Sequence, residues 1–469
     1  AELELGLLHP DGSGPTEAEV IEFINIYREY AHRFGITPQV DREACQYQIE
    51  VHVAPGIGYS RTRHSLDGIM SALVATGQRT GLQTAILSVY PVLSDFKLTD
   101  NPKVHTAVDL MIELNARFEE YVERQQIARK RYNLASDSNV VQIFRLQGCH
   151  IHLDLAGRSE ALGLLAFHTM LRSATSVAGY AVLKGGPFVN GTCDADLLCA
   201  REYLRSTTVT GRHLEVPLSP HFAPQGFERF GGLIQKERAN ASGRAHLYED
   251  GLGEPISAMH NPLGRVRSDL KMSKRICTLE ATGLPVNISA SRMAAILTDF
   301  AFSHILIENY FRNYGLDLNP MYDDQELWAI LGPLSTEVFN QMQAASDKEG
   351  TDAVLTLATG EQLTLSEFYE RKRIYMHRHL AEIAGITPRD IDDVYMSLQR
   401  MLAPPSGRKA ETIEQYIADP ILRSTGNWGQ ILRNAFIEAG GTLGEHNPDA
   451  VLAVTKRIHA ALCQRYNNT

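Results

Sequence analysis

Four short segments of this 469-residue chain alternate polar and apolar side chains with a period of two, and no other feature constrains the fold as strongly. A period of two places successive side chains on opposite faces of a β-strand. In the first three segments the polar face carries Glu, Gln, His and Asp, without Lys or Arg. Its members are Glu2 and Glu4, then Gln46, Gln48, Glu50 and His52, then His150, His152 and Asp154. The fourth segment, Arg275–Thr282, places Glu280 between Thr278 and Thr282 on one face. The pattern predicts a mainly antiparallel sheet with one polar and one apolar face.

The polar face has two interpretations. It is either the solvated face of an antiparallel sheet or a cation site. A solvated face usually mixes Lys, Arg, Ser and Thr with acids, whereas carboxylates gathered on one face repel one another unless a cation lies between them. Several Glu with one or two His favour Mg²⁺ or Mn²⁺ over structural zinc. Such ions commonly hold substrate phosphates, so the pattern indicates phosphoryl or acyl-phosphate chemistry.

Composition excludes several classes of protein. Apolar residues make up 44% of the chain and charged residues 21%, as in an ordinary soluble globular protein. Acidic residues outnumber basic ones, 55 to 45, which argues against a nucleic-acid partner. The six cysteines show no C-x-x-C spacing, which favours a reducing compartment. The apolar stretch 293–311 is interrupted by Asp299, His304 and Glu308, so we expect no membrane span. We expect a cytoplasmic protein. The composition does not decide between a monomer and a homo-oligomer.

Helical patterns surround these strands. A capping box of Thr16 and Glu19 predicts a helix that ends before Gly35. Further amphipathic segments lie at 64–84, 104–131, 160–179 and 290–314, and the chain from about 320 onward is mostly helical with a hairpin at 354–365. Residues 211–270 show little periodicity. The basic cluster is interpreted as the solvated face of one helix; it consists of Arg371, Lys372, Arg373 and Arg378.

Taken in order, the polar segments and the motifs between them resemble the glutamate–cysteine ligase superfamily of carboxylate–amine ligases, whose fold is related to that of glutamine synthetase. The resemblance covers roughly residues 1–310. The matching elements are Glu2-Leu-Glu4, Gln46-Tyr-Gln48-Ile-Glu50, Arg131-Tyr132, Gly148-Cys-His150-Ile-His152, Pro187-Phe188-Val-Asn-Gly191 with Asp194 and Arg201, and Thr278-Leu-Glu280.

The resemblance implies an α+β fold in which a curved, mainly antiparallel sheet binds metal and ATP on its concave face. Helices would pack on the outside, with a catalytic domain at 1–317 and a mostly helical C-terminal region at 318–469. It implies an ATP-dependent carbon–nitrogen ligase that joins glutamate, or a related amino acid, to an amine such as cysteine. The implied metal or phosphate ligands are Glu2, Glu4, Glu50, His150 and Glu280. The implied catalytic residues are His152 and Arg201, and the implied cofactor-binding residues are Gln48, His150 and Arg201.

The chain departs from the family pattern at Thr282, where the family strand usually carries an Arg that faces the transferred phosphate. Either another arginine replaces it, or the activity is altered or lost; the arginines in the right region are Arg201, Arg212, Arg265 and Arg267. Glu43 lies close to the second acidic segment, but straight-strand alternation places it on the opposite face from Glu50. Two alternative functions are a non-catalytic regulatory relative that binds a nucleotide or amino acid, and a metal-dependent hydrolase built on His150 and His152.

Overall fold

The computed structural model describes residues 1–56, 58–91, 97–102, 119–134, 141–154, 169–208, 270–273, 278–315, 319–381, 385–418 and 425–467, with single positions between these ranges. In this part of the chain seven strands form one sheet in the order β2-β3-β1-β5-β9-β8, with β4 paired to β1. The strands are β1 (Glu2–Leu8), β2 (Val40–Arg42), β3 (Gln48–His52), β4 (Gln83–Ala85), β5 (Cys149–Asp154), β8 (Leu270–Ser273) and β9 (Thr278–Ala281). All of the pairings are antiparallel, which confirms the mainly antiparallel sheet.

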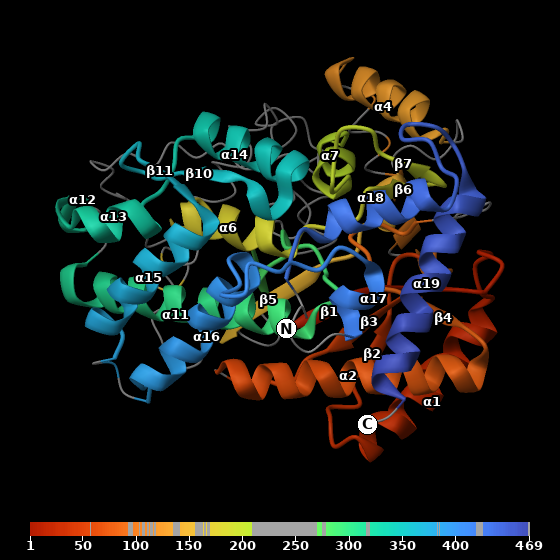
Figure 1. Ribbon diagram of the computed structural model, residues 1–469, viewed down its shortest axis with the longest axis horizontal. Coiled ribbons are helices and arrows are strands. Elements are labelled where there is room, and N and C mark those ends of the chain that lie inside the picture. Colours follow the sequence, from red (N-terminus) through yellow and green to blue (C-terminus); the bar gives the residue numbers. More distant parts are fainter. Residues whose placement is uncertain are drawn as a thin grey trace.

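The apolar face of this sheet is the centre of the core. Leu3, Leu5 and Val51 are fully buried, as strand alternation predicts, in the same cluster as apolar side chains of three helices. These helices are α1 (Glu17–Arg33), α2 (Tyr59–Thr80) and α11 (Ala290–Tyr314). They pack against one another through the pairs α1–α2 and α2–α11, and Figure 1 shows α2 running beneath the strands. Burying one face of the sheet in this way leaves the other face for polar side chains.

The helix predictions hold with shifted boundaries. The capping box of Thr16 and Glu19 is formed, and α11 spans the predicted range 290–314. The segment predicted as helix 64–84 is wrong at both ends, because α2 begins at Tyr59 and Gly81 ends it in the left-handed conformation at φ 76°. The chain then enters β4. By length and composition α11 could cross a membrane, but 94% of its apolar window is buried within the protein, so it is a core helix.

The C-terminal part is helical, as predicted. Beyond α11 its helices are α12 (Asn319–Asp323), α13 (Gln325–Leu331), α14 (Thr336–Glu349), α15 (Leu365–His379), α16 (Pro388–Leu402), α17 (Ile413–Ala418), α18 (Trp428–Glu438) and α19 (Pro448–Tyr466). The predicted hairpin is β10 (Val354–Thr356) with β11 (Gln362–Thr364). For the predicted helix 104–131, most of the described residues lie in α4 (Glu119–Tyr132). For the predicted helix 160–179, α6 (Ala174–Leu183) covers the end of the range and extends beyond it. Residues 211–269 lie outside the described part.

The C-terminal helices pack directly on the N-terminal part. α19 contacts α2 and β4, as Figure 1 shows at the side where the chain ends. It also contacts β7 (Thr192–Cys193), which forms a hairpin with β6 (Phe188–Val189). The backbone N–H of Gly444 donates to the Cys193 carbonyl, and that of Asn447 donates to the Gly191 carbonyl. Residues from both sides of position 317 belong to one hydrophobic cluster. The C-terminal region therefore supports the elements that carry the sheet.

Candidate metal centre

The register of the central strand β1 aligns the acidic residues predicted from the sequence. Glu2 lies opposite His52 of β3, and Glu4 lies opposite Glu50 of the same strand. Directly opposed residues of an antiparallel pair project from the same face with close Cβ atoms. Two carboxylates therefore lie side by side at the Glu4–Glu50 position, an arrangement that is destabilising unless a proton or a cation lies between them.

The other edge of β1 adds the histidines. Glu2 lies opposite His150 of β5, and His152 of β5 lies opposite Glu280 of β9. His150 Nδ1 lies 3.4 Å from a Glu280 oxygen, and its Nε2 lies 3.4 Å from a Glu4 oxygen. His152 Nε2 lies 2.8 Å from Glu2 Oε2. The sheet therefore brings together all five residues that the sequence predicts as metal ligands, from four different strands.

His52 closes the β3 side of this group. Its Nδ1 lies 3.5 Å from Glu2, and its Nε2 lies 3.4 Å from Glu50 and 3.5 Å from Asp41. The hydrogen bond with Glu50 raises the pKa of His52 above its ordinary value, in opposition to burial. Burial raises the pKa of Glu2, but hydrogen bonds from His150 and His152 lower it. The combined lowering effect of the hydrogen bonds is the larger one, so the pKa of the Glu2 carboxyl lies well below its usual range. Glu2 is therefore an anion surrounded by imidazoles.

The side chains of this group are largely shielded from solvent. The exposed fraction ranges from 6% for His150 to 19% for His52 among Glu2, Glu4, Glu50, Glu280 and the three histidines. Coulomb interactions are screened less at such sites than at the surface. The interpretation of this face as an ordinary solvated sheet face is therefore disfavoured.

Among the described residues, three overlapping sets of ligand atoms are close enough to hold a metal ion. They are Glu2 with Glu50 and His150, Glu2 with His152 and Glu280, and Glu4 with Glu43 and Glu50, each with its atoms within 4.8 Å of one another. Glu2 and Glu50 each belong to two sets. Carboxylate oxygens with one imidazole suit Mg²⁺ or Mn²⁺, which take oxygen-rich ligand sets and leave positions for substrate phosphate.

Glu43 corrects the prediction from straight-strand alternation. It lies in the turn between β2 and β3 rather than on β3, which begins only at Gln48, so the period of two does not extend to it. The structure brings its carboxyl to Glu4 and Glu50. Burial raises the pKa of Glu43 well above its ordinary value, and the charges of Glu4 and Glu50 raise it further. The shift shows that Glu43 lies in the repulsive field of these two acids.

Gly148 leaves room for the cluster. A Cβ atom at this position would lie 2.8 Å from His150 Nε2 and 2.9 Å from Glu4 Oε2, so a larger residue would require one of these two ligand groups to move. The donor atoms of the cluster fit a divalent cation.

We expect Gly148→Ala to lower the affinity for Mn²⁺ by about tenfold or more, because the added methyl group displaces His150 or Glu4. Equilibrium dialysis with Mn²⁺ measures this. The control is Gly179→Ala, whose Cβ would meet the Phe300 ring at 2.6 Å in the core. That variant should lose folding stability while the folded protein keeps its Mn²⁺ affinity, and equal Mn²⁺ affinities for Gly148→Ala and wild type would contradict the role of Gly148.

The predicted residues Gln48 and Arg201 have partners within the protein. Gln48 is buried opposite Gly6, and its amide donates to the Leu146 carbonyl at 3.4 Å. Arg201 is fully buried at the start of α7 (Arg201–Ser206) and donates to the backbone carbonyls of Gln147, Thr282 and Gly283 at 2.7 to 3.2 Å. These bonds join the chain before β5 to the chain after β9. Arg201 thus holds the two strands that carry His150, His152 and Glu280.

Thr282 follows β9 and is buried, and its hydroxyl has no hydrogen-bond partner within the described residues. Its backbone carbonyl accepts the hydrogen bond from Arg201. Three of the arginines that could replace the family's phosphate-facing Arg, namely Arg212, Arg265 and Arg267, lie outside the described residues.

Two other motifs that the sequence places far apart meet at Asp194. Arg131 donates to both carboxylate oxygens, at 2.7 and 2.5 Å, and the Tyr132 hydroxyl donates to the same group. The backbone N–H groups of Asp196 and Leu197 add two bonds of 2.8 Å. Burial raises the pKa of Asp194, but these hydrogen bonds outweigh it, and the net pKa lies below the ordinary value.

Asp194→Asn is expected to lower the free energy of unfolding at neutral pH by about 2 kcal/mol, because it removes the buried carboxylate that accepts from Arg131, Tyr132 and two backbone N–H groups, while Arg131 keeps only its exposed partner Asp196. The pKa of Asp194 is lower in the folded than in the unfolded protein, so the stabilisation is present above pH 3.8 and is lost as the pH falls through the depressed pKa. Urea unfolding at several pH values should therefore show a gap between variant and wild type that narrows in acid. A gap that stays constant would contradict this account.

Comparison with protein-family models and with curated proteins returned no match, so the function is argued from the site itself.

Proposed function

We propose that the chain is an ATP- and Mg²⁺-dependent carboxylate–amine ligase. In the proposed reaction the γ-phosphoryl group of ATP is transferred to the side-chain carboxylate of glutamate or a related amino acid, with release of ADP. An amine then attacks the acyl carbon, phosphate leaves, and the nitrogen loses a proton as the amide forms. Mn²⁺ is the alternative cation.

One observation carries this proposal. Three overlapping ligand sets, sharing Glu2 and Glu50, lie on one shielded face of an antiparallel sheet. Phosphoryl transfer needs little covalent help from the protein; it needs cations that bridge phosphate oxygens and neutralise developing charge. Ligand sets that share residues would keep neighbouring cations close together, as a polyphosphate requires.

The residues of the chain have separate roles in this proposal. Glu2, Glu4, Glu50, His150 and Glu280 would hold the cations, and Glu43 would join them after losing its proton. A divalent cation bound there supplies charge neutralisation for the phosphate oxygens. His152 contacts Glu2 at 2.8 Å and is the proposed residue at the substrate end of the cluster. Arg201 is a positioning residue in this scheme, because three of its hydrogen bonds end on backbone carbonyls beside β5 and β9 and its charge is paired with the Glu202 carboxylate.

Residues from motifs that lie far apart in the sequence also meet in the structure. Arg131 and Tyr132 meet Asp194, and Arg201 meets the chain on either side of the β5–β9 pair.

Thr282 favours a second candidate function. A regulatory relative that binds nucleotide and cations without transferring phosphate would keep the acidic face and lose the phosphate-facing Arg, and Thr282 stands at that position. The hydrolase alternative has less support, because His150 and His152 lie in the middle of an antiparallel sheet.

The deciding experiment measures phosphate release from ATP with Mg²⁺ and glutamate, in the presence of cysteine, other amino acids or simple amines. Amine-dependent phosphate release with an amide product identified by mass spectrometry would establish the ligase. ATP binding by calorimetry without turnover under any condition would favour the regulatory relative. Absence of both cation-dependent ATP binding and turnover would overturn the proposal, and hydrolysis of amides with a tightly held zinc ion would favour the hydrolase.

A further inference from the structure

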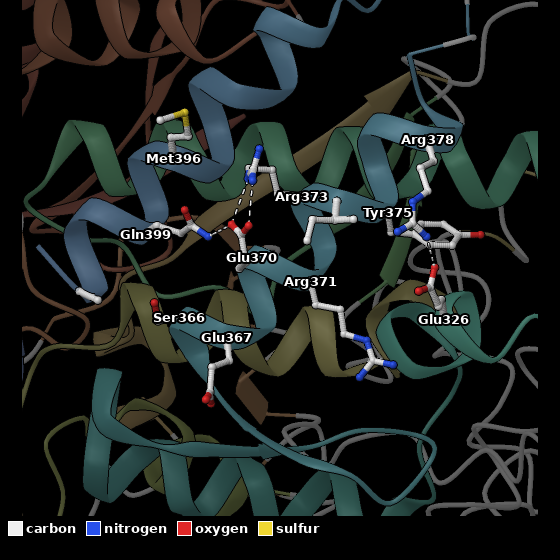
Figure 2. Close-up of a pocket in the computed structure, with 12 residues that line it drawn as sticks. Glu326, Ser366, Glu367, Glu370, Arg371, Arg373, Tyr375, Arg378, Met396 and Gln399 are labelled. Atoms are coloured by element: carbon white, nitrogen blue, oxygen red, sulfur yellow. Dashed lines mark hydrogen bonds and ion pairs between the residues drawn. The ribbon is translucent and has the colours of Figure 1, made fainter. Parts of the chain in front are cut away.

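A groove of about 790 Å³ lies on the C-terminal helices, between α15 and α16 and beside α13. Figure 2 shows its lining, with Arg371, Arg373 and Arg378 along α15 and Met396 and Gln399 on α16. Two large apolar side chains in this lining are exposed to solvent: Ile374 at 39% and Met396 at 40%. Exposed apolar residues in one groove rimmed by charge are typical of a protein–protein contact.

Four residues of α15 form a solvent-facing stripe. Glu367, Ile374 and Arg378 are exposed and Arg371 is partly buried, and His379 at the end of the helix is exposed beside them. Their spacing of four, three and four residues keeps them on one face of the helix. The opposite side of α15, with Phe368, Lys372 and Tyr375, is buried. Among the described residues the stripe is therefore a side of α15 that is open to a partner.

The stripe is complementary to itself. When two copies of α15 pack antiparallel about a two-fold axis between positions 372 and 373, Glu367 of each copy faces Arg378 of the other. The same axis sets Ile374 of each copy against the stem of Arg371 of the other. One symmetry operation thus satisfies both pairings, which is the requirement for an isologous dimer. Long Arg stems can cover apolar surface while their charged heads stay in water.

The charges within the groove already balance, which disfavours a strongly acidic partner. Arg378 Nη1 lies 2.8 Å from Glu326, Arg373 lies 2.8 Å from Glu370, and Arg371 pairs with Glu361. An outside polyanion would have to displace these carboxylates. A second copy of the chain adds one carboxylate to Arg378, whose guanidinium has donors for two.

We propose that the chain forms a homodimer through α15 and α16, with two copies of this helix pair packed as a four-helix arrangement. Ile374 and Met396 of each copy fill the groove of the other, and the two Glu367–Arg378 pairs set the antiparallel register. This proposal does not rest on the ligase function. A contact of two helix pairs is smaller than an obligate interface, so the dimer should dissociate in the micromolar range.

Sedimentation equilibrium of the full chain over a range of micromolar concentrations tests the proposal. We expect a mass that rises from monomer to dimer, and Arg378→Glu and Glu367→Arg should each raise the dissociation constant by about tenfold or more through like-charge contacts. The double variant Glu367→Arg with Arg378→Glu should restore dimerisation, since it exchanges the two charges. Ile374→Asp should leave a monomer.

The matched control is Ile437→Asp, which places the same charge at a side chain of α18 that is 51% exposed and lies outside the groove. It should dimerise as the wild type does. Thermal unfolding of every variant separates dissociation from misfolding, which matters for Glu367 because its carboxylate caps α15 at Thr364. Three results would each overturn the proposal. They are a monomeric mass at all concentrations, a double variant that dimerises no more tightly than the single variants, and an Ile437→Asp variant that loses dimerisation as fully as Ile374→Asp does.

Discussion

Replacing Glu50 with Gln is expected to remove tight binding of divalent cations and to reduce ATP-dependent phosphate release by at least about 100-fold. Glu50 belongs to two of the three ligand sets, so its loss affects both the Glu2–His150 end and the Glu4–Glu43 end of the cluster. Glutamine keeps the shape of the side chain but removes its charge. Binding of Mn²⁺ by dialysis and phosphate release measure the two effects.

The same substitution should leave the fold intact. In the metal-free protein, Glu50 lies against Glu4 across the strand pair and against Glu43, and this repulsion destabilises the folded state. Glu50→Gln also loses the contact of Glu50 with His52, so we expect the midpoint temperature of unfolding of the metal-free variant to lie close to that of the wild type. Loss of binding would then come from the ligand and not from misfolding.

His150→Ala should behave in the same way in binding and turnover, because His150 touches Glu4 and Glu280. The control is Glu29→Gln, which removes an exposed carboxylate paired with Arg79 and lies outside the three ligand sets. This variant should bind Mn²⁺ and release phosphate from ATP as the wild type does. Near-normal turnover in either Glu50→Gln or His150→Ala would refute the cation-site interpretation.

The sequence predicts the strand faces well wherever a strand is straight. Glu2, Glu4, His150 and His152 share one face, because the period of two follows from backbone geometry alone and needs no knowledge of neighbouring strands. The pairing of those strands is harder to predict from the sequence. Nothing in the sequence fixes the register that sets Glu2 between His52 and His150, because it depends on turns and on the packing of the apolar face.

Turns mark where the prediction fails. The pattern over residues 45–53 suggests one strand, yet β3 starts at Gln48, and Gln46 lies in the turn and donates its amide to the Pro15 carbonyl at 3.1 Å. The same turn brings Glu43 to the acidic face. Alternation carries no information beyond the end of a strand, so Glu43 could be found only as an acid close in sequence to Glu50.

The basic cluster on α15 shows a second kind of failure. Arg371, Arg373 and Arg378 lie toward the groove, but Lys372 is fully buried and the interpretation as a solvated face is wrong for it. Its Nζ lies 2.6 Å from Asp299 Oδ1 on α11, and the Tyr395 hydroxyl donates to the same oxygen at 2.7 Å. A buried charge depends on a counter-ion from a distant element, which local sequence cannot identify.

Asp299→Ala is expected to lower the free energy of unfolding by about 3–5 kcal/mol, because it leaves the Lys372 ammonium buried without a counter-ion. Asp299→Leu combined with Lys372→Met should recover most of this loss, since it replaces both charges by apolar groups of similar volume. Urea unfolding with linear extrapolation measures the three free energies. If the double variant is as unstable as Asp299→Ala, the ion pair is not the cause.

The pH dependence of Asp299→Ala separates an uncompensated charge from a simple cavity. Burial already lowers the pKa of Lys372 from its ordinary value of 10.5, and the charge of Asp299 opposes this effect. Without Asp299 the folded-state pKa falls further, so the unfolded chain binds more protons than the folded one between that pKa and 10.5. The stability of Asp299→Ala should therefore rise toward that of the wild type as the pH increases through this window. A cavity would cost the same free energy at every pH, and a pH-independent deficit would show that α11 and α15 are joined by packing and not by this charge pair.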